Sequence, residues 1–201
     1  MIYVFDFDGT LVDTNNLKLN CIIKTLRSHT GCKLSYKFIN EFANKFIQMS
    51  GITREKKFMD LLSHKLDQNS IQELIKKYSE LVIKEINNEY IDSSVITIIN
   101  RLQEKNSVFI CSGARLREIE MVLRNSDPIT LDGIYCSRLG KTTFLKFLNQ
   151  QDEVVFFGDS EDDYSSAKIA KVAFVRVTQF SSLEIDNFTG KSIKSIKDYF
   201  N

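Results

Sequence analysis

Cysteine, histidine and proline are scarce in this 201-residue sequence, and each scarcity excludes a class of site or structure. The four cysteines form no Cys-x-x-Cys pair and have only two histidines to support them, so the sequence gives no zinc site. We therefore expect free thiols in a reducing compartment, the cytoplasm. The single proline and the absence of any glycine- or serine-rich tract leave no visible linker. The cysteines are Cys21, Cys32, Cys111 and Cys136.

Long apolar runs and an excess of charge of one sign are also missing. No apolar run approaches the roughly 20 residues that cross a bilayer, and the chain starts without a cationic leader, so we expect neither membrane insertion nor export. The net charge is +1 and the basic residues are spread along the chain, which gives no electrostatic case for nucleic-acid binding. The 43% hydrophobic and 26% charged residues are typical of a soluble globular protein.

Two aspartates stand close to the N-terminus, directly after a short apolar stretch. Residues 3–5 predict a buried strand, and Asp6 and Asp8 follow it one residue apart. Because alternate residues of a strand point to the same side, both carboxylates can face one site beyond the end of the sheet. Such a pair repels and is costly to bury unless it shares a cation or holds a proton. Gly9 supplies the backbone freedom needed where the chain leaves the sheet.

The periodicity of the apolar residues changes along the chain and predicts two structural units. Residues 15–90 have helical spacing with no strand signal, which predicts an inserted helical bundle. Beyond it strands and helices alternate, the signature of a parallel sheet with helices on both faces. We therefore predict a Rossmann-like α/β core at 1–14 and 91–201 and an all-helical domain at 15–90. Apolar residues within 193–200 predict only a packing helix.

Two polar positions in the second half of the chain have a possible chemical role. Ser112 follows the strand predicted at 108–111, where its hydroxyl and the N–H of Gly113 suit a phosphate oxygen. The alternative is that Ser112 simply caps the next helix. Lys141 begins a predicted helix, where its charge is unfavourable for the helix dipole, so we expect another group to hold it. Lys146 is its rival, and a solvated lysine is the simpler alternative.

These positions resemble the four motifs of the haloacid dehalogenase (HAD) superfamily. Asp6-Phe7-Asp8-Gly9-Thr10 matches the first motif, in the DxDGT form of its phosphatases and phosphomutases. Ser112 and Lys141 stand at the second and third motifs. The segment Gly158-Asp159-Ser160-Glu161-Asp162-Asp163 matches the fourth motif in its GDSxxD form. The motifs occur in the expected order and together span nearly the whole chain.

The resemblance implies two-step phosphoryl transfer. It implies that Asp6 attacks phosphorus to give an aspartyl-phosphate, which splits one difficult displacement into two easier ones. Asp8 would protonate the leaving alcohol and then deprotonate the attacking water. Ser112, Gly113 and Lys141 would bind the phosphoryl oxygens and stabilise their charge.

The resemblance also implies Mg²⁺ as the cofactor, since carboxylate oxygens are the hard ligands that this ion prefers. The ion would be held by Asp6, by Asp159 and by the backbone carbonyl of Asp8. Asp163 would contact it directly, through water, or from behind another ligand. We expect the two acids between Asp159 and Asp163 to point to solvent or to cap the following helix.

The helical insert resembles the C1-type cap of the phosphoglycolate phosphatase and β-phosphoglucomutase-like branch, which closes over a small substrate. Gly51-Ile52-Thr53-Arg54 looks like the cap loop, so Arg54 is expected to hold a second anionic group of the substrate. An exposed arginine at a helix start is the alternative. Sugar phosphates and phosphoglycolate-like acids are both open as substrates. A phosphomutase would share these catalytic residues, and a non-catalytic phosphometabolite-binding or regulatory protein is the alternative from another class.

Overall fold

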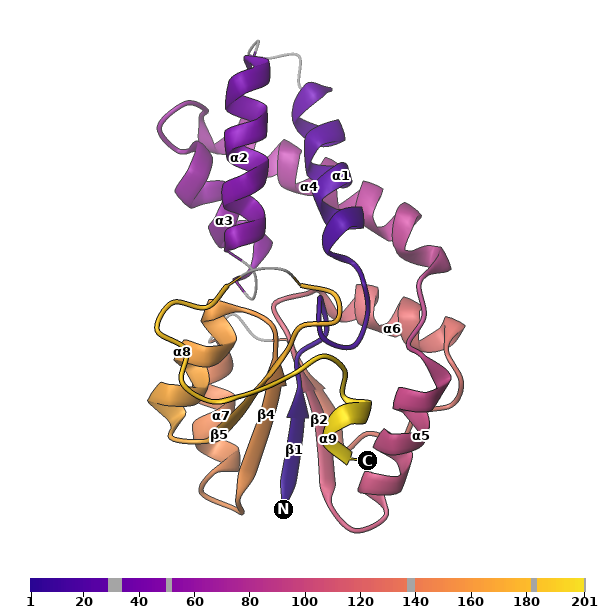
Figure 1. Cartoon of the computed structure of the whole chain (residues 1–201). Helices are drawn as coiled ribbons and strands as arrows, with labels where there is room; N and C mark the ends of the chain where they lie inside the picture. The colour runs from indigo at the N-terminus through magenta and orange to yellow at the C-terminus, as the bar shows by residue number, and fades with distance from the viewer. Residues whose placement is uncertain (29–33, 50–51, 137–139, 182–183, 201) are drawn as a thin grey trace.

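The computed structural model describes residues 1–28, 34–49, 52–136, 140–181 and 184–200, and in them a six-stranded sheet lies below a bundle of helices (Figure 1). The strands are β1 (Ile2–Phe5), β2 (Ser107–Cys111), β3 (Gly133–Tyr135), β4 (Val154–Gly158), β5 (Ala173–Val177) and β6 (Lys191–Ile193). Their order is β3-β2-β1-β4-β5-β6, and every neighbouring pair is parallel. The predicted α/β fold is confirmed.

The N-terminal strand β1 lies inside the sheet, between β2 and β4. Phe5, at its end, is in register with Ile110 of β2 and with Phe157 of β4. Because the three parallel strands end at nearly the same level, the residues that follow them emerge at one edge of the sheet. This register places the segments after β1, β2 and β4 next to one another.

Helices cover both faces of the sheet, and alternate residues of β1 contact the helices on opposite faces. The covering helices are α5 (Ser93–Gln103), α6 (Leu116–Asn125), α7 (Lys141–Leu148), α8 (Glu161–Ala170) and α9 (Lys197–Phe200). Phe5 belongs to the apolar cluster that includes residues of α5, α6 and α9. Val4 belongs to a cluster with α7 and α8. The two-residue period of the strand therefore buries β1 on both sides.

The chain between β1 and α5 forms a helical bundle with an apolar core of its own. Its helices are α1 (Asn15–Arg27), α2 (Tyr36–Gln48), α3 (Arg54–Leu62), α4 (Gln68–Glu85) and the 3-10 helix η1 (Ile86–Asn88). Aromatic rings from three of these helices meet in the core, and Phe46 packs edge to face on Tyr78 at 5.4 Å between ring centroids. We propose this bundle as the cap domain, residues 15–90, and its separate core supports that division.

The C-terminal segment differs from the expectation drawn from the sequence, whereas the cysteines agree with it. The predicted C-terminal packing helix is in part wrong, because Ile193 ends the edge strand β6 and the helix α9 begins only at Lys197. The cysteines within the described residues are free thiols, and Cys32 lies outside them.

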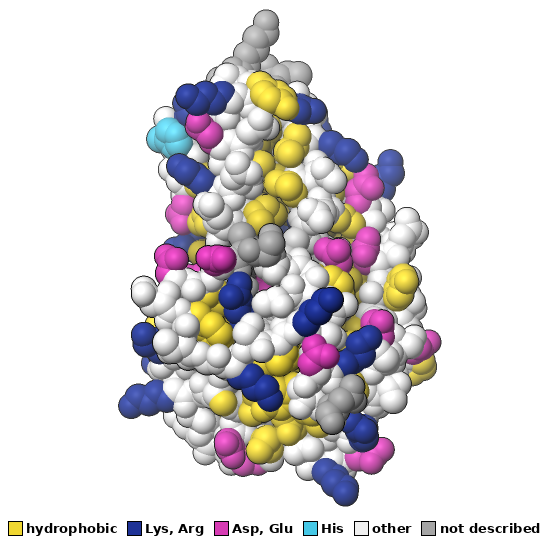
Figure 2. Space-filling model, in the orientation of Figure 1, with side chains coloured by type: hydrophobic (Ala, Val, Ile, Leu, Met, Phe, Trp, Pro, Cys, Tyr) yellow, Lys and Arg dark blue, Asp and Glu magenta, His cyan; other side chains and the backbone are white. Residues whose placement is uncertain are grey.

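The surface shows no large area of one charge on the face drawn in Figure 2, where basic and acidic side chains are interspersed over both halves of the molecule. No helix in the described part of the chain is long and apolar enough to cross a lipid bilayer.

Candidate active site

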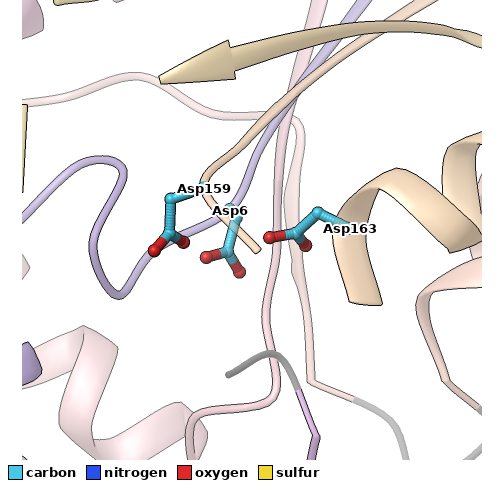
Figure 3. Close-up of side chains that lie close together, drawn as sticks. All are labelled: Asp6, Asp159 and Asp163. Carbon is cyan, nitrogen blue, oxygen red and sulfur yellow. The ribbon is translucent and has the colours of Figure 1, made fainter. Parts of the chain in front are cut away.

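Three carboxylates converge at the edge of the sheet where β1 and β4 end. Asp6 follows β1, Asp159 follows β4, and Asp163 comes from the first turn of α8 (Figure 3). One oxygen from each lies within 4.8 Å of the others, and all three side chains are buried. Burial and the charge of Asp163 raise the pKa of Asp6 well above its ordinary value and raise the pKa of Asp159 to about 7. Both shifts come first from burial and then from repulsion between the acids, so the ionised cluster is costly unless a further cation shares it.

Lys141 supplies one positive charge to this cluster. From the first residue of α7, its Nζ donates to Asp6 Oδ1 at 2.7 Å and also to Asp163 Oδ1. Burial alone would lower the pKa of Lys141, but the carboxylates of Asp163 and Asp6 hold it well above its ordinary value. These acids explain how a lysine can stand at the unfavourable start of a helix. Lys146, its rival in the sequence, is exposed.

The remaining charge and the unpaired oxygens of the cluster fit a divalent cation. One lysine faces three carboxylates, so the ionised cluster keeps an excess of negative charge. Neither oxygen of Asp159 accepts a hydrogen bond of ordinary geometry from the described residues, although the Ser181 hydroxyl lies near it. A buried polar atom without a partner costs about 1–3 kcal/mol, and a charged one costs more. Because carboxylate oxygens are the ligands of Mg²⁺, the cluster fits this ion.

Asp163 also shapes the start of α8. Its Oδ2 accepts hydrogen bonds from the N–H and the hydroxyl of Ser160, whose Oγ in turn accepts from the Asp163 N–H at 3.2 Å. This reciprocal pair is a capping box. Since Oδ1 faces Lys141, both oxygens of Asp163 already have partners. We therefore propose that Asp163 supports the metal site from behind, with Asp6 and Asp159 as the direct ligands.

Two glycines let these acids lie close to the backbone. Gly9 has a φ of +79°, and a Cβ at this position would stand 2.5 Å from Oδ2 of Asp159. A Cβ at Gly158 would stand 2.6 Å from the Cβ of Asp163. Any side chain at either position would displace a carboxylate of the cluster, so both positions require glycine.

Asp8 lines a pocket together with Asp6, but it has different partners from the three clustered acids. Its carboxylate accepts hydrogen bonds from the Thr14 hydroxyl and from Nζ of Lys18. Burial alone would raise the pKa of Asp8, but the ion pair with Lys18 lowers it below its ordinary value. Before substrate binds, Asp8 is therefore a fixed carboxylate that can accept a proton.

Ser112 and Gly113 line this pocket after the end of β2. Ser112 is buried, and its hydroxyl oxygen accepts a hydrogen bond from the Ala114 N–H at 3.1 Å. The helix α6 begins only at Leu116, so Ser112 belongs to the preceding turn and is not the N-cap residue. The helix-capping alternative is wrong, and the hydroxyl hydrogen of Ser112 can still be donated to a ligand.

Three charged residues of this site were missed in the sequence: Lys18, Lys57 and Glu118. Glu118, on α6, is fully buried, pairs with Arg54 of α3 and lies 3.4 Å from Nζ of Lys18 on α1. Lys57, on α3, is buried and lines the pocket. The ion pairs of Glu118 with Arg54 and Lys18 join the sheet-covering helix α6 to two helices of the bundle.

Arg54 is 6% exposed, so the alternative of an exposed arginine is wrong. Its Nη1 donates to Ser79 Oγ at 3.0 Å and its Nη2 pairs with Glu118. The side chain lines the pocket, but its guanidinium already has partners within the protein. Its predicted contact with substrate stays a prediction. Gly51 of the predicted cap loop lies outside the described residues.

The family of haloacid dehalogenase-like hydrolases matches residues 3–177, which is most of the chain. The chain belongs to this family. The resemblance inferred from the four motifs is therefore confirmed. No curated protein sequence matches this HAD-like hydrolase.

Solved structures with the same architecture cover nearly the whole chain of this HAD-like hydrolase. A hydrolase from Pseudomonas syringae gives a TM-score of 0.77 at 16% identity and covers 100% of this chain and 96% of its own. CbbY from Rhodobacter sphaeroides, in complex with phosphate, gives 0.74 at 14% identity, with 96% and 93% covered. A candidate phosphoglycolate phosphatase from Lactobacillus plantarum gives 0.68 at 18% identity, with 99% and 97% covered. At these identities the likeness shows a shared fold.

Replacing Asp159 by asparagine should separate metal binding from folding in this HAD-like hydrolase. We expect the metal-free variant to melt about 2–4 °C higher than the wild type, because the change removes one of three repelling carboxylates, an effect of roughly 1 kcal/mol. Mg²⁺ should raise the melting temperature of the wild type and leave that of the variant unchanged. Thermal unfolding in EDTA and in excess Mg²⁺ measures both effects. A variant that Mg²⁺ stabilises as much as the wild type would show that Asp159 is not a ligand.

Proposed function

We propose that this HAD-like hydrolase is a magnesium-dependent phosphatase that hydrolyses a small phosphorylated metabolite through an aspartyl-phosphate. The observation that carries the proposal is the buried cluster in which Lys141 contacts Asp6 beside the unpaired carboxylate of Asp159. A carboxylate flanked by a lysine and by cation-binding acids is suited to attack an anionic phosphate. Mg²⁺, when bound by Asp6 and Asp159, would offset the repulsion between nucleophile and phosphate.

In the first step a carboxylate oxygen of Asp6 forms a bond to phosphorus while the bond from phosphorus to the ester oxygen breaks. Asp8 gives a proton to the departing alcohol, and the negative charge of the bound phosphate raises the pKa of Asp8 so that it holds this proton. Lys141, Ser112 and the N–H of Gly113 supply positive charge and hydrogen bonds to the other phosphoryl oxygens.

In the second step water attacks the phosphorus of the aspartyl-phosphate and Asp8 takes its proton. The phosphorus–oxygen bond to Asp6 breaks, which releases inorganic phosphate and restores the free carboxylate. The hydrogen bonds from Thr14 and Lys18 orient the carboxylate of Asp8 for both proton transfers, and the charge of Lys18 favours its ionised form in this step.

The shape of the pocket supports a small substrate. It is lined by residues of both the sheet edge and the helical bundle, and its cavity volume is about 40 Å³. A cavity of this size holds roughly three ordered waters, which suits a phosphoryl group with a small attached alcohol. A sugar phosphate or a phosphoglycolate-like acid remains the proposed class of substrate, and the phosphate complex of CbbY on the same fold agrees with a phosphoester. Closure around so small a pocket would exclude bulk water from the reaction.

A phosphomutase of the β-phosphoglucomutase kind is the second candidate, since it would use the same Asp6, Asp8 and Lys141. It would differ by protecting the aspartyl-phosphate from water until a second hydroxyl accepts the group. A non-catalytic phosphometabolite-binding or regulatory protein on the same fold is the third. Against it stands the full set of acids, since Asp6 and the acid–base residue Asp8 line the pocket and Asp159 and Asp163 lie beside Asp6, whereas simple binding needs no acid–base residue.

Release of inorganic phosphate from small phosphomonoesters, phosphoglycolate among them, tests the enzyme against the binder. We expect turnover in Mg²⁺, loss of turnover in EDTA, and recovery when Mg²⁺ is restored, because Asp6 and Asp159 need the cation to accept an anionic substrate. A rate that is unchanged by EDTA would contradict the metal dependence. A screen of phosphorylated metabolites then distinguishes phosphate release, expected of a phosphatase, from conversion to an isomeric phosphate, expected of a mutase.

A further inference from the structure

Lys57 is a buried cation without a direct anionic partner in the pocket. It lies on α3, is 9% exposed and lines the same cavity as Asp6 and Asp8. No described residue accepts a hydrogen bond from its Nζ or forms an ion pair with it, and its ammonium lies 4.5 Å from the ring centroid of Phe46. A cation over an aromatic ring gains about 0.5–2 kcal/mol, which is less than the cost of removing an ammonium from water.

The other cations around this pocket have carboxylate partners. Lys18 pairs with Asp8 and lies beside Glu118, and Arg54 pairs with Glu118. On the bundle side of the pocket, three cations therefore share two carboxylates. The cation that is left over is Lys57.

The surroundings of Lys57 disfavour its charged form when the pocket holds no anion. Burial and the neighbouring charge of Lys18 lower the pKa of Lys57 to about 7, despite the opposing effect of Asp8. Arg54 and Lys141 act in the same direction as Lys18. An anion that binds beside the ammonium would relieve this cost, so the pocket is prepared for a ligand with a negative group in addition to the phosphoryl group.

We propose that Lys57 binds a carboxylate of the substrate, so that the substrate is a short phosphorylated acid; this inference rests on the proposed phosphatase function. One surplus cation matches the single charge of a carboxylate better than the double charge of a second phosphate. The small cavity also leaves little room beyond one phosphoryl group and a chain of a few atoms. The sequence suggested Arg54 for this role, but its guanidinium forms an ion pair with Glu118 and donates a hydrogen bond to Ser79.

A pair of substrates that differ only at the second group tests this assignment. Phosphoglycolate carries a carboxylate where 2-hydroxyethyl phosphate carries a hydroxymethyl group. We expect the wild type to prefer phosphoglycolate in kcat/KM, and Lys57→Met to lower that preference at least about tenfold, because methionine keeps the packing on Phe46 without the charge. Lys56→Met is the matched control: Lys56 is on the same helix with its side chain 64% exposed, so the preference should stay at the wild-type value. Lys57→Gln repeats the measurement if the methionine variant does not fold.

Binding separates this inference from the proposed function. Calorimetry on Asp6→Asn protein in Mg²⁺ gives the dissociation constant of each compound with and without Lys57→Met. If neither compound is hydrolysed but phosphoglycolate binds more tightly and loses that advantage in Lys57→Met, the phosphatase proposal fails and the assignment of Lys57 stands. Hydrolysis with a preference that Lys57→Met leaves unchanged overturns the assignment alone. A protein that neither turns over nor binds phosphoglycolate in preference to 2-hydroxyethyl phosphate also overturns it.

Discussion

We expect Asp6→Asn to lower kcat for every phosphoester substrate by about 10³-fold or more, because the amide cannot attack phosphorus or accept the phosphoryl group. The two side chains have nearly the same shape, so the pocket keeps its lining and substrate can still bind. The hydrogen bond from Lys141 to Asp6 Oδ1 can be kept by the amide oxygen. Phosphate release at saturating substrate and Mg²⁺ measures the loss.

Asp13→Asn is the matched control for this experiment, since Asp13 lies seven residues further along the chain and is exposed. Its kcat should equal that of the wild type. Acid quenching of the wild type during turnover, followed by mass spectrometry, should find a phosphoryl group on the peptide that contains Asp6. Activity of Asp6→Asn near the wild-type level, with intact Mg²⁺ dependence, would reject Asp6 as the nucleophile.

Lys141→Met should lower both the catalytic efficiency and the free energy of unfolding. We expect kcat/KM to fall by about 10²–10³-fold, because the phosphoryl oxygens lose a preorganised cation. The free energy of unfolding in EDTA should fall by about 3–5 kcal/mol, because Asp6 and Asp163 would be left buried with no lysine between them. Denaturant unfolding with and without Mg²⁺ measures the second effect, which should shrink when the ion supplies part of the missing charge.

Lys146→Met is the natural comparison, because Lys146 belongs to the same helix but is exposed. It should change the free energy of unfolding by less than about 0.5 kcal/mol and leave kcat/KM as in the wild type. Equal effects of the two substitutions would mean that the ion pairs of Lys141 are not what distinguishes it.

The fold and the acidic half of the site could be predicted because both depend on local patterns. Apolar strands are followed directly by Asp6, by Ser112 and, after Gly158, by Asp159. Parallel strands bring such positions to one edge of a sheet whatever the remaining sequence is. The register of β1 with β2 and β4 brings the segments that follow these strands, which are far apart in the sequence, to one site.

The missed charged residues on the helices α1, α3 and α6 could not be assigned to the site, because their contacts depend on how the helices pack together. Lys18, Lys57 and Glu118 each occupy the buried face of a helix, a position where a charged residue is unusual and could have been noticed. The sequence does not show what lies opposite that face. Glu118 meets Arg54 across 64 residues, and this contact depends on how the bundle packs on the sheet. The strand β6 escaped prediction because it is only three residues long and two of them are polar.

The two glycines beside the acid cluster limit how this chemistry can be moved to another protein. Copying the charged side chains onto a different scaffold would not reproduce the site, because the room they occupy is left by the missing Cβ atoms of Gly9 and Gly158. A designer would have to transplant both loop backbones, including the left-handed turn at Gly9, before any carboxylate could take its place.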